Sequence, residues 1–545
     1  MRTSGASPWT ASSSLASFSI SPRRLPLSVS GGCSDPASPR IASRSSMIFS
    51  QTGEIMERVQ VEYEPYFSKH PGWAEQKPEL YWNSLAKACQ KLKSLNRDVF
   101  LNIAGVGVTT QRDSMINVDE NGKPLRPAVI WLDQRKARPF FANKGLLNLG
   151  LKILNFEKLV LEIQSKGKCN WIMQNQPEIW ERTHKYLQVS GFLNFKLTGN
   201  FIDSVASQIG HVPFNYKKQT WANKFELSAR VFPVEIEKLP QIAIPGEIMG
   251  TITDKASETT GLGKGIPVIA CGSDKGCETL GAGVIQENMA SLSFGTTATI
   301  QTTSEKYFEA IKFMPAYPSP APGLFNSEVE IFRGFWMITW FKNEFAQKEV
   351  EEAKQAGIPA EEVLNKCLIQ TEPGSMGLVV QPYWGPGLDH PQAKGAMIGF
   401  GDVHTKPHIY RAVIEGLGFA LCEGREKIEK KSKIKIEKAA VSGGASQSDE
   451  ICKITADIFN IPMVKGRTHE TSGLGAAIVI AKGLGMYSSL DEAVKNMIKI
   501  KKVFEPDQNN VKIYKELYSK VYSKMYKALE PLYSQIQQIT GYPKE

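Results

Sequence analysis

The chain has 545 residues, 42% of them hydrophobic and 22% charged, a composition that argues against a fibrous or wholly disordered protein. No stretch approaches about 18 consecutive apolar residues, so we expect no membrane-spanning segment and no membrane partner. The net charge of +10 is modest for this length and is not gathered in one basic run, so we expect no nucleic acid as a partner.

Residues 1–46 differ in composition from the rest of the chain. They are rich in Ser, contain five Arg and have a single acidic residue, Asp35. No period of 2 or 3.6 is visible, so we expect a disordered Ser/Arg-rich tail. Such a composition at an N-terminus is typical of an organellar transit peptide. A wrongly translated upstream segment and a natural disordered tail are the alternatives.

From Met47 onward the pattern is that of an α/β protein. Residues 78–92 predict a helix, because apolar side chains recur at helical spacing (Trp82, Leu85, Cys89 and Leu92). Residues 99–108 (VFLNIAGVGV) then predict a buried strand, because small and β-branched residues dominate them.

Further short buried strands are predicted downstream, over 267–271, 290–294, 298–302 and 439–442. A helical pattern follows the last of them, and an amphipathic helix over 511–529 lies near the end of the chain. Strands that run into turns of Gly, Ser and Thr and then into helices indicate an α/β fold. In such folds ligands bind at the carboxyl ends of the strands, so the turns are candidate sites.

Two of these turns could bind a nucleotide. In residues 293–297 (SFGTT), Gly would let the backbone approach a phosphate, and N–H groups and Thr hydroxyls could donate to it. Residues 443–446 (GGAS) lack the Lys-Ser/Thr ending of a P-loop but could seat a base or ribose. The alternatives are a plain hairpin turn and a plain strand-to-helix turn.

Asp274 comes shortly after the buried strand 267–271, beyond Gly272 and Ser273, and lies among small residues. A carboxylate in that position can meet a substrate, and it suits a general base that accepts a hydroxyl proton during phosphoryl transfer. The alternative is an Asp that caps the next helix.

Residues 110–113 (TQRD) and 131–135 (WLDQR) form a further candidate site. Adjacent Arg and Asp side chains can hold vicinal hydroxyls, since one donates hydrogen bonds and the other accepts them. A Trp could cover the C–H surface of a sugar. The alternative is a surface ion pair beside a core aromatic residue.

Together these motifs resemble the FGGY family of carbohydrate kinases. The resemblance covers residue 47 to about residue 490 and rests on segments in family order: 70–76 (HPGWAEQ), 107–111 (GVTTQ), 122–133 (GKPLRPAVIWLD), 197–199 (LTG) with Asp203 and 206–207 (AS), Asp274, 294–297 (FGTT), 399–415, 443–445 (GGA) and 470–477 (ETSGLGAA). It implies an α/β, two-domain actin/hexokinase-like (ribonuclease H-like) ATPase fold with an interdomain cleft.

The resemblance also implies an activity and site residues. The activity is phosphorylation of a sugar or polyol hydroxyl by ATP, with Mg²⁺ in the donor complex and no protein residue identified as a metal ligand. Asp274 matches the catalytic base. The implied nucleotide-binding residues are Gly295, Thr296, Thr297, Gly443, Gly444, Ala445 and Ser446. The implied acceptor-binding residues are Gln111, Arg112, Asp113, Trp131 and Lys275.

One departure concerns the start of the family pattern. The family begins with a strand that carries an Asp-x-Gly-Thr turn, the first phosphate site, whereas residues 40–46 here read RIASRSS. We therefore expect the first strand of the N-terminal domain to be missing, through a wrong gene model or in a defective kinase. The second case would make the chain a catalytically impaired protein that still binds sugar or nucleotide.

The resemblance and the composition also predict the domain bounds, the class of acceptor and the cellular compartment. We expect residues 47–285 to form the sugar-binding domain and residues 286–545 the nucleotide-binding domain with a C-terminal helix. We expect the acceptor to be a pentulose, a polyol or a related sugar. The pair Asp274-Lys275 matches neither the Asp-Gln associated with glycerol kinases nor the Asp-Asn of xylulokinase-like members, so the individual acceptor is unassigned. Sparse cysteines indicate a cytoplasmic protein, with an organelle as the alternative, and a homodimer is left open.

Overall fold

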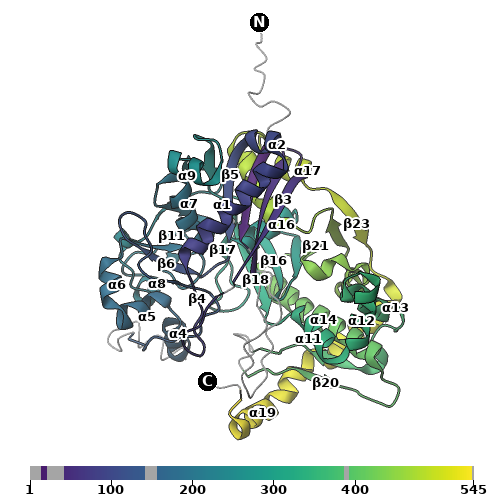
Figure 1. Cartoon of the computed structure of the whole chain (residues 1–545). Helices are drawn as coiled ribbons and strands as arrows, with labels where there is room; N and C mark the ends of the chain where they lie inside the picture. The colour runs from purple at the N-terminus through teal and green to yellow at the C-terminus, as the bar shows by residue number, and fades with distance from the viewer. Residues whose placement is uncertain (1–13, 21–41, 65, 141–155, 386–391, 543–545) are drawn as a thin grey trace.

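The computed structural model describes residues 14–20, 42–64, 66–140, 156–385 and 392–542. Two large mixed sheets organise these residues, one in each half of the chain. In Figure 1 most helices of the first half lie to the left and the helices within residues 336–432 lie to the lower right, whereas the helix over 471–483 lies beside the first sheet. This arrangement confirms the predicted α/β fold with two domains.

The first large sheet has six strands, and the predicted strand at 99–108 is among them. Its spatial order is β13 (Ile248–Thr251), β14 (Pro267–Ile269), β5 (Ile103–Thr110), β1 (Ser14–Ile20), β2 (Ala42–Ser50) and β3 (Ile55–Tyr63). The β5 strand starts later than predicted, because a short helix, α2 (Arg97–Leu101), precedes it. The Asn96 side chain caps this helix by accepting from the Val99 amide at 3.2 Å.

The β1 strand corrects two expectations about the start of the chain. It pairs antiparallel with β2 and parallel with β5, so it occupies a central position and the first strand is not missing. Residues 14–20 and 42–46 are strands and not a disordered tail, while 1–13 and 21–41 lie outside the described residues. Leu15 and Ala16 are fully buried on opposite faces. Such a strand needs no alternating polarity, because both of its faces are covered.

The second large sheet has seven strands, and both turns predicted to bind a nucleotide follow strands of this sheet. Its spatial order is β17 (Tyr317–Pro318), β18 (Phe325–Ile331), β16 (Ala298–Ser304), β15 (Met289–Phe294), β21 (Lys438–Ser442), β22 (Met463–Gly466) and β23 (Ile500–Phe504). The β15 and β21 strands are parallel neighbours, with Met289 opposite Lys438 and Ser293 opposite Ser442. Their carboxyl ends therefore lie side by side.

The remaining strands of the described residues form smaller sheets. One has four strands, β4 (Glu75–Gln76), β7 (Ala128–Val129), β6 (Met115–Val118) and β8 (Lys185–Gln188). The others are pairs: β10 (Phe214–Asn215) with β11 (Thr220–Trp221), β9 (Ile202–Ser204) with β12 (Gln241–Ala243), and β19 (Val379–Gln381) with β20 (Ala396–Ile398).

Helices cover both faces of the first sheet. The α1 helix (Pro78–Leu95) packs its predicted apolar face against one side. The α16 helix (Thr471–Gly483) comes from the second half of the chain and packs on the other side, against Leu15, Met47 and Phe49. The two halves of the chain therefore share one apolar cluster. The expected domain boundary at residue 285 stays a prediction.

The remaining helices divide between the two halves. Those of the first half are α4 (Glu157–Ser165), α5 (Lys168–Asn175), α6 (Pro177–Arg182), α7 (Val189–Thr198), α8 (Leu227–Val231), α9 (Asp254–Thr260) and α10 (Asp274–Gly281). Those of the second half are α11 (Trp336–Phe345), α12 (Gln347–Ala356), α13 (Ala360–Ile369), α14 (Lys406–Ser432), α15 (Asp449–Phe459), α17 (Leu490–Met497), α18 (Gln508–Leu517) and α19 (Ser523–Thr540).

The predicted helix over 511–529 is longer and interrupted. A π-helical turn (Tyr518–Tyr522) separates α18 from α19. Tyr518 and Tyr522 stack there with ring centroids 5.9 Å apart, and both contact Phe419 of α14. Among the described residues, no helix is both long enough and apolar enough to cross a bilayer.

Candidate active site

A cleft of about 1380 Å³ is lined by residues of both large sheets. It brings together most of the residues that the sequence singled out, which come from the ends of β5, β15 and β21, from the start of α10 and from the segment after β7. These residues are Gln111, Arg112, Asp113, Trp131, Asp274, Lys275, Gly295, Thr296, Thr297, Gly443, Gly444 and Ala445.

Asp274 is the first residue of α10 and lines the cleft. It is not the helix cap, because the Ser273 hydroxyl takes that role by accepting from the Gly276 amide at 3.2 Å. Burial raises the pKa of the Asp274 carboxyl to about 6, although Arg112 and Lys275 nearby act in the opposite direction. A carboxyl with this pKa is ionised at neutral pH and is a better proton acceptor than an exposed Asp.

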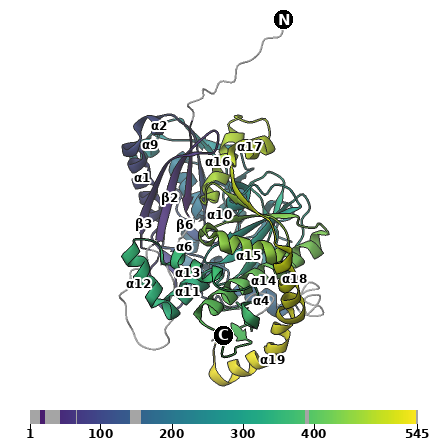
Figure 2. The same cartoon turned by 90° about the vertical axis from the view of Figure 1, so that its right-hand side faces the viewer.

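The α10 helix is held in place by backbone-to-backbone packing against α16, and the two helices lie beside each other (Figure 2). A Cβ added at Gly281 would come within 2.0 Å of the Thr471 carbonyl oxygen. A Cβ at Gly475 would come within 1.9 Å of the Cys277 carbonyl oxygen. The glycines in these small-residue segments therefore permit the close contact that fixes the position of Asp274.

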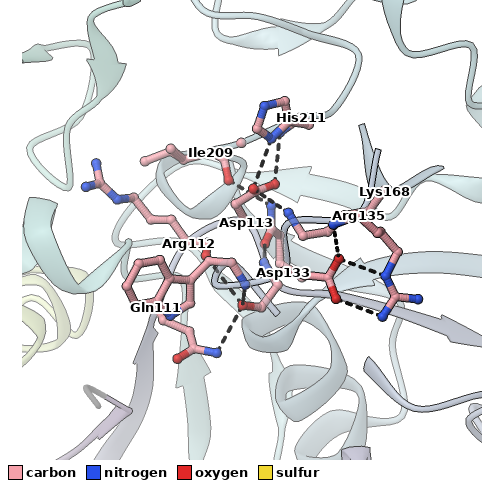
Figure 3. A network of polar contacts seen from close by, with 12 residues as sticks. Gln111, Arg112, Asp113, Asp133, Arg135, Lys168, Ile209 and His211 are labelled. Carbon is pink, nitrogen blue, oxygen red and sulfur yellow. Dashed lines mark hydrogen bonds and ion pairs between the residues drawn. The ribbon is translucent and has the colours of Figure 1, made fainter. Parts of the chain in front are cut away.

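Asp113 lies at the centre of a polar network beside the cleft (Figure 3). Its carboxylate accepts from Lys168 Nζ at 2.5 Å and contacts His211 Nδ1 at 2.9 Å. Burial alone would raise the pKa of Asp113, but Lys168 and His211 outweigh burial and hold this pKa below its usual value. Gly210 makes room for the contact, because a Cβ there would lie 2.5 Å from Asp113 Oδ1.

Arg112 does not pair with its neighbour Asp113, so the simple surface ion pair considered above is not formed. Its guanidinium forms two contacts with the Glu328 carboxylate in β18, at 2.6 and 3.2 Å. Burial would lower the pKa of Arg112, but Glu328 outweighs it and holds the pKa above its usual value. Arg112 therefore stays charged beside Asp274.

Gln111 and Trp131, two other residues predicted to bind the acceptor, both donate a hydrogen bond to the Ser114 hydroxyl. Gln111 Nε2 donates to Ser114 Oγ at 3.0 Å, and the Trp131 amide donates to the same oxygen at 3.2 Å. Both residues line the cleft. Further along, Arg135 binds the Asp133 carboxylate and lies against the rings of Trp73 and Trp171, so that end of the motif is structural.

Lys275, predicted to contact the acceptor, points toward the two turns that are predicted to bind a nucleotide. Its ammonium group donates to Glu278 Oε2 at 2.8 Å and to Ser293 Oγ at 2.7 Å, directly before the turn at Gly295. Glu278 in turn accepts from the Ser442 hydroxyl at 2.7 Å, directly before the turn at Gly443. This network connects the helix that carries Asp274 to both turns.

The two nucleotide turns touch each other through their backbones. Gly443 has φ +83°, and a Cβ added there would lie 2.8 Å from the Phe294 carbonyl carbon. Glycine is therefore required on both conformational and steric grounds. Ser446 is buried and donates its hydroxyl to the Gly443 carbonyl at 2.7 Å. It braces the turn and is the one predicted site residue that does not line the cleft.

Comparison with known proteins decides the family. The models for the FGGY family of carbohydrate kinases match residues 42–281 with the N-terminal domain and residues 290–484 with the C-terminal domain. The chain belongs to this family. It is therefore a carbohydrate kinase, a phosphotransferase with an alcohol group as acceptor, and kinases of this family use ATP.

Individual relatives of this FGGY kinase cover nearly all of it. A xylulose kinase of Lactococcus lactis is 26% identical over 481 residues, 87% of this chain and 93% of the relative. A glycerol kinase of Thermococcus gammatolerans is 26% identical over 472 residues, 85% of this chain and 91% of the relative. The crystal structure of a xylulose kinase from Rhodospirillum rubrum superposes with a TM-score of 0.78 at 21% identity, over 96% of this chain and 100% of that one.

Sequence reasoning missed three residues that contact the predicted acceptor residues Asp113 and Arg112, namely Lys168, His211 and Glu328. Each comes from a segment far from Asp113 or Arg112 in sequence and reaches them only in the fold. Glu328 alone gave a usable signal, because it is an acid inside an otherwise buried strand, and a buried acid needs a partner.

The described residues do not supply an obvious metal site. No group of three or more His, Cys, Asp or Glu side chains gathers in the described ranges in a way that could hold a metal ion.

Proposed function

We propose that this kinase transfers the γ-phosphoryl group of ATP, bound as its Mg²⁺ complex, to a hydroxyl of a pentulose or a polyol. The named relatives, xylulose and glycerol kinases, act on acceptors of this kind. The observation that carries the proposal is the place of Asp274. Its carboxylate lies in one cleft with Arg112 and Asp113 on one side and the turns at Gly295 and Gly443 on the other.

Each half of the cleft has a distinct task in this proposal. Arg112, Asp113 and Gln111 hold hydroxyl groups of the acceptor, because they combine donors with acceptors in a partly desolvated pocket. The N–H groups of the turns at Gly295 and Gly443 hold the nucleotide. Asp274 accepts the proton of the attacking hydroxyl as the new bond to phosphorus forms and ADP leaves.

A transfer assay tests the proposal. The full chain is incubated with ATP, Mg²⁺ and, one at a time, xylulose, xylitol, ribitol and glycerol, and the products are identified by mass spectrometry. We expect ADP and one sugar or polyol phosphate in equal amounts. Release of ADP and inorganic phosphate without any phosphorylated acceptor would contradict the proposal.

A second candidate function is supported by one sequence observation. The chain has no Asp-Gly-Thr before residue 50, although the family carries its first phosphate site there. The chain could then bind acceptor and nucleotide without transferring phosphate. This candidate predicts that calorimetry detects binding of both ligands while the transfer assay yields no product.

We also propose a cytoplasmic location, with an organelle as the alternative. The seven cysteines within the described residues are all buried and unpaired, which fits a reducing compartment. Fractionation of cells that produce the full chain with a C-terminal tag tests this, because an imported protein would appear in the organelle fraction.

A further inference from the structure

The Arg112–Glu328 ion pair joins the two domains at the acceptor side of the cleft. Arg112 follows β5 in the N-terminal domain, and Glu328 lies in β18 of the C-terminal domain. Both carboxylate oxygens are used, at 2.6 and 3.2 Å from the two terminal nitrogens of the guanidinium. The Glu328 side chain is fully buried, whereas that of Arg112 remains 18% exposed. Arg112 is therefore part of the cleft wall, and Glu328 lies buried next to it without lining the cleft itself.

The other cations around Asp113 and Asp274 also have acidic partners within the described part of the chain. Lys275 pairs with Glu278 at 2.8 Å, and Lys168 pairs with Asp113 at 2.5 Å. Asp274 adds a carboxylate whose nearest cations, Arg112 and Lys275, are already paired. The acceptor side thus has no surplus of positive charge to offer an acidic ligand.

We propose that Glu328 is a specificity residue that reserves the acceptor pocket for neutral sugars and polyols and excludes sugar acids. The planar guanidinium of Arg binds a carboxylate through two parallel N–H donors. In this kinase Glu328 occupies two such donors of Arg112, so a sugar acid would have to displace it. The inference rests on the proposed function, in which the acceptor binds beside Arg112 and Asp274.

The exclusion has a physical basis beyond occupancy. A sugar acid that displaced Glu328 would leave that carboxylate buried without its partner, which is strongly unfavourable. A sugar acid that did not displace it would place its own charge near Glu328 and Asp274, and like charges in an interface oppose binding. A neutral polyol meets neither obstacle, since its hydroxyls can use the remaining donors and acceptors.

Replacing Glu328 by Gln should therefore change the preferred charge of the ligand. The amide keeps the size of the side chain but leaves Arg112 with an uncompensated positive charge. A charge-assisted hydrogen bond to the new ligand then favours a sugar acid by about 10- to 100-fold. The substitution acts on the charge of the acceptor, so it should not change the affinity for the nucleotide in the other half of the cleft.

Titration calorimetry with xylitol and with xylonate at neutral pH tests the inference. We expect the wild-type chain to bind xylitol at least tenfold more tightly than xylonate, and Glu328→Gln to shift this ratio toward xylonate by at least tenfold. Glu328→Asp, which keeps the charge, should retain the wild-type preference. Glu349→Gln is the matched control, because Glu349 pairs with Lys406 at 2.6 Å in the same domain and does not line the cleft.

The outcomes separate the inference from the proposed function. Binding of the nonhydrolysable analogue AMP-PNP verifies that each variant is folded, and Glu328→Met replaces Glu328→Gln if the latter fails this check. A wild-type chain that binds xylonate as well as xylitol, or a ratio unchanged by the substitution, overturns the inference alone. A wild-type chain that binds none of xylitol, xylulose, ribitol or glycerol overturns the proposed function, and the inference with it.

Discussion

The two halves of the cleft differ in the groups that line them: charged side chains in one half and backbone turns in the other. The half that we propose to hold the acceptor, the acceptor half, presents charged side chains, each held by a partner from a distant segment, such as Asp113 with Lys168 and Arg112 with Glu328. The half that we propose to hold the nucleotide, the nucleotide half, consists of two turns of small residues whose backbones touch at Gly443 and Phe294. Asp274 lies between the halves, and its helix is connected to both turns through Lys275 and Glu278.

This difference indicates how each half can change. An acceptor pocket made of side-chain pairs can alter its specificity by single substitutions, because a new side chain changes charge without moving the backbone. A nucleotide site made of backbone N–H groups depends on the conformation of its turns, and few side chains can replace Gly there. Substitutions in the two halves should therefore have separable effects.

The largest expected effect is that of replacing Asp274, which lies between the two halves of the cleft. Asp274→Asn keeps the size of the side chain but cannot accept the hydroxyl proton, so kcat should fall by about 10²- to 10⁴-fold. Affinities for AMP-PNP and for the acceptor should stay within a few fold, as measured by calorimetry. Asp254→Asn is the matched control, because Asp254 also begins a helix but is exposed. A variant that retains more than about a tenth of the wild-type kcat would exclude Asp274 as the base.

A change in the acceptor half should act on one ligand only. Asp113→Ala removes a carboxylate that organises Lys168 and His211, so the affinity for the acceptor should fall by roughly 5- to 150-fold, the equivalent of about 1–3 kcal/mol. The affinity for AMP-PNP should be unchanged. Asp113→Asn, which retains hydrogen bonding, should lose less. Equal loss of both ligands would show that Asp113 supports the fold and not the acceptor.

A change in the nucleotide half should show the reverse pattern. Gly443→Ala introduces a Cβ 2.8 Å from the Phe294 backbone at a positive φ, so we expect the turns to separate and AMP-PNP affinity to fall by about tenfold, or about 1–2 kcal/mol. Gly357→Ala is the matched control, since its φ is +66° and no atom lies within 4 Å of the added Cβ. Unchanged AMP-PNP affinity would show that this turn does not hold the nucleotide.

The smallest expected effect is the pH dependence of kcat/KM, which we attribute to Asp274. The base must be ionised, and burial raises the pKa of Asp274 to about 6, so kcat/KM should fall about tenfold per pH unit below that value. The residual activity of Asp274→Asn should lack this decline, which separates it from titration of the ATP phosphates. A decline that begins only near pH 4, the usual range of an exposed Asp, would contradict the assignment.

The local arrangement of the two turns could be predicted from the sequence, whereas the side-chain pairs on the other side of the cleft could not. Turns such as 293–297 and 443–446 are contiguous, so their residues and their chemistry can be read together. The pairs around Asp113 and Arg112 join segments that are 55 to 216 residues apart, and nothing local specifies them. The β1 strand was missed for a related reason, because its order comes from pairing with β2 and β5 on both sides.

A crystal structure of the full chain with AMP-PNP and the acceptor identified by the transfer assay tests the central claim most directly. The account predicts that the acceptor lies beside Arg112 and Asp113, with one hydroxyl about 2.6–3.2 Å from the Asp274 carboxylate and directed at the terminal phosphate. It also predicts that the phosphates contact the turn at Gly295. An acceptor bound away from Asp113, or a terminal phosphate out of reach of the hydroxyl that Asp274 contacts, would contradict it.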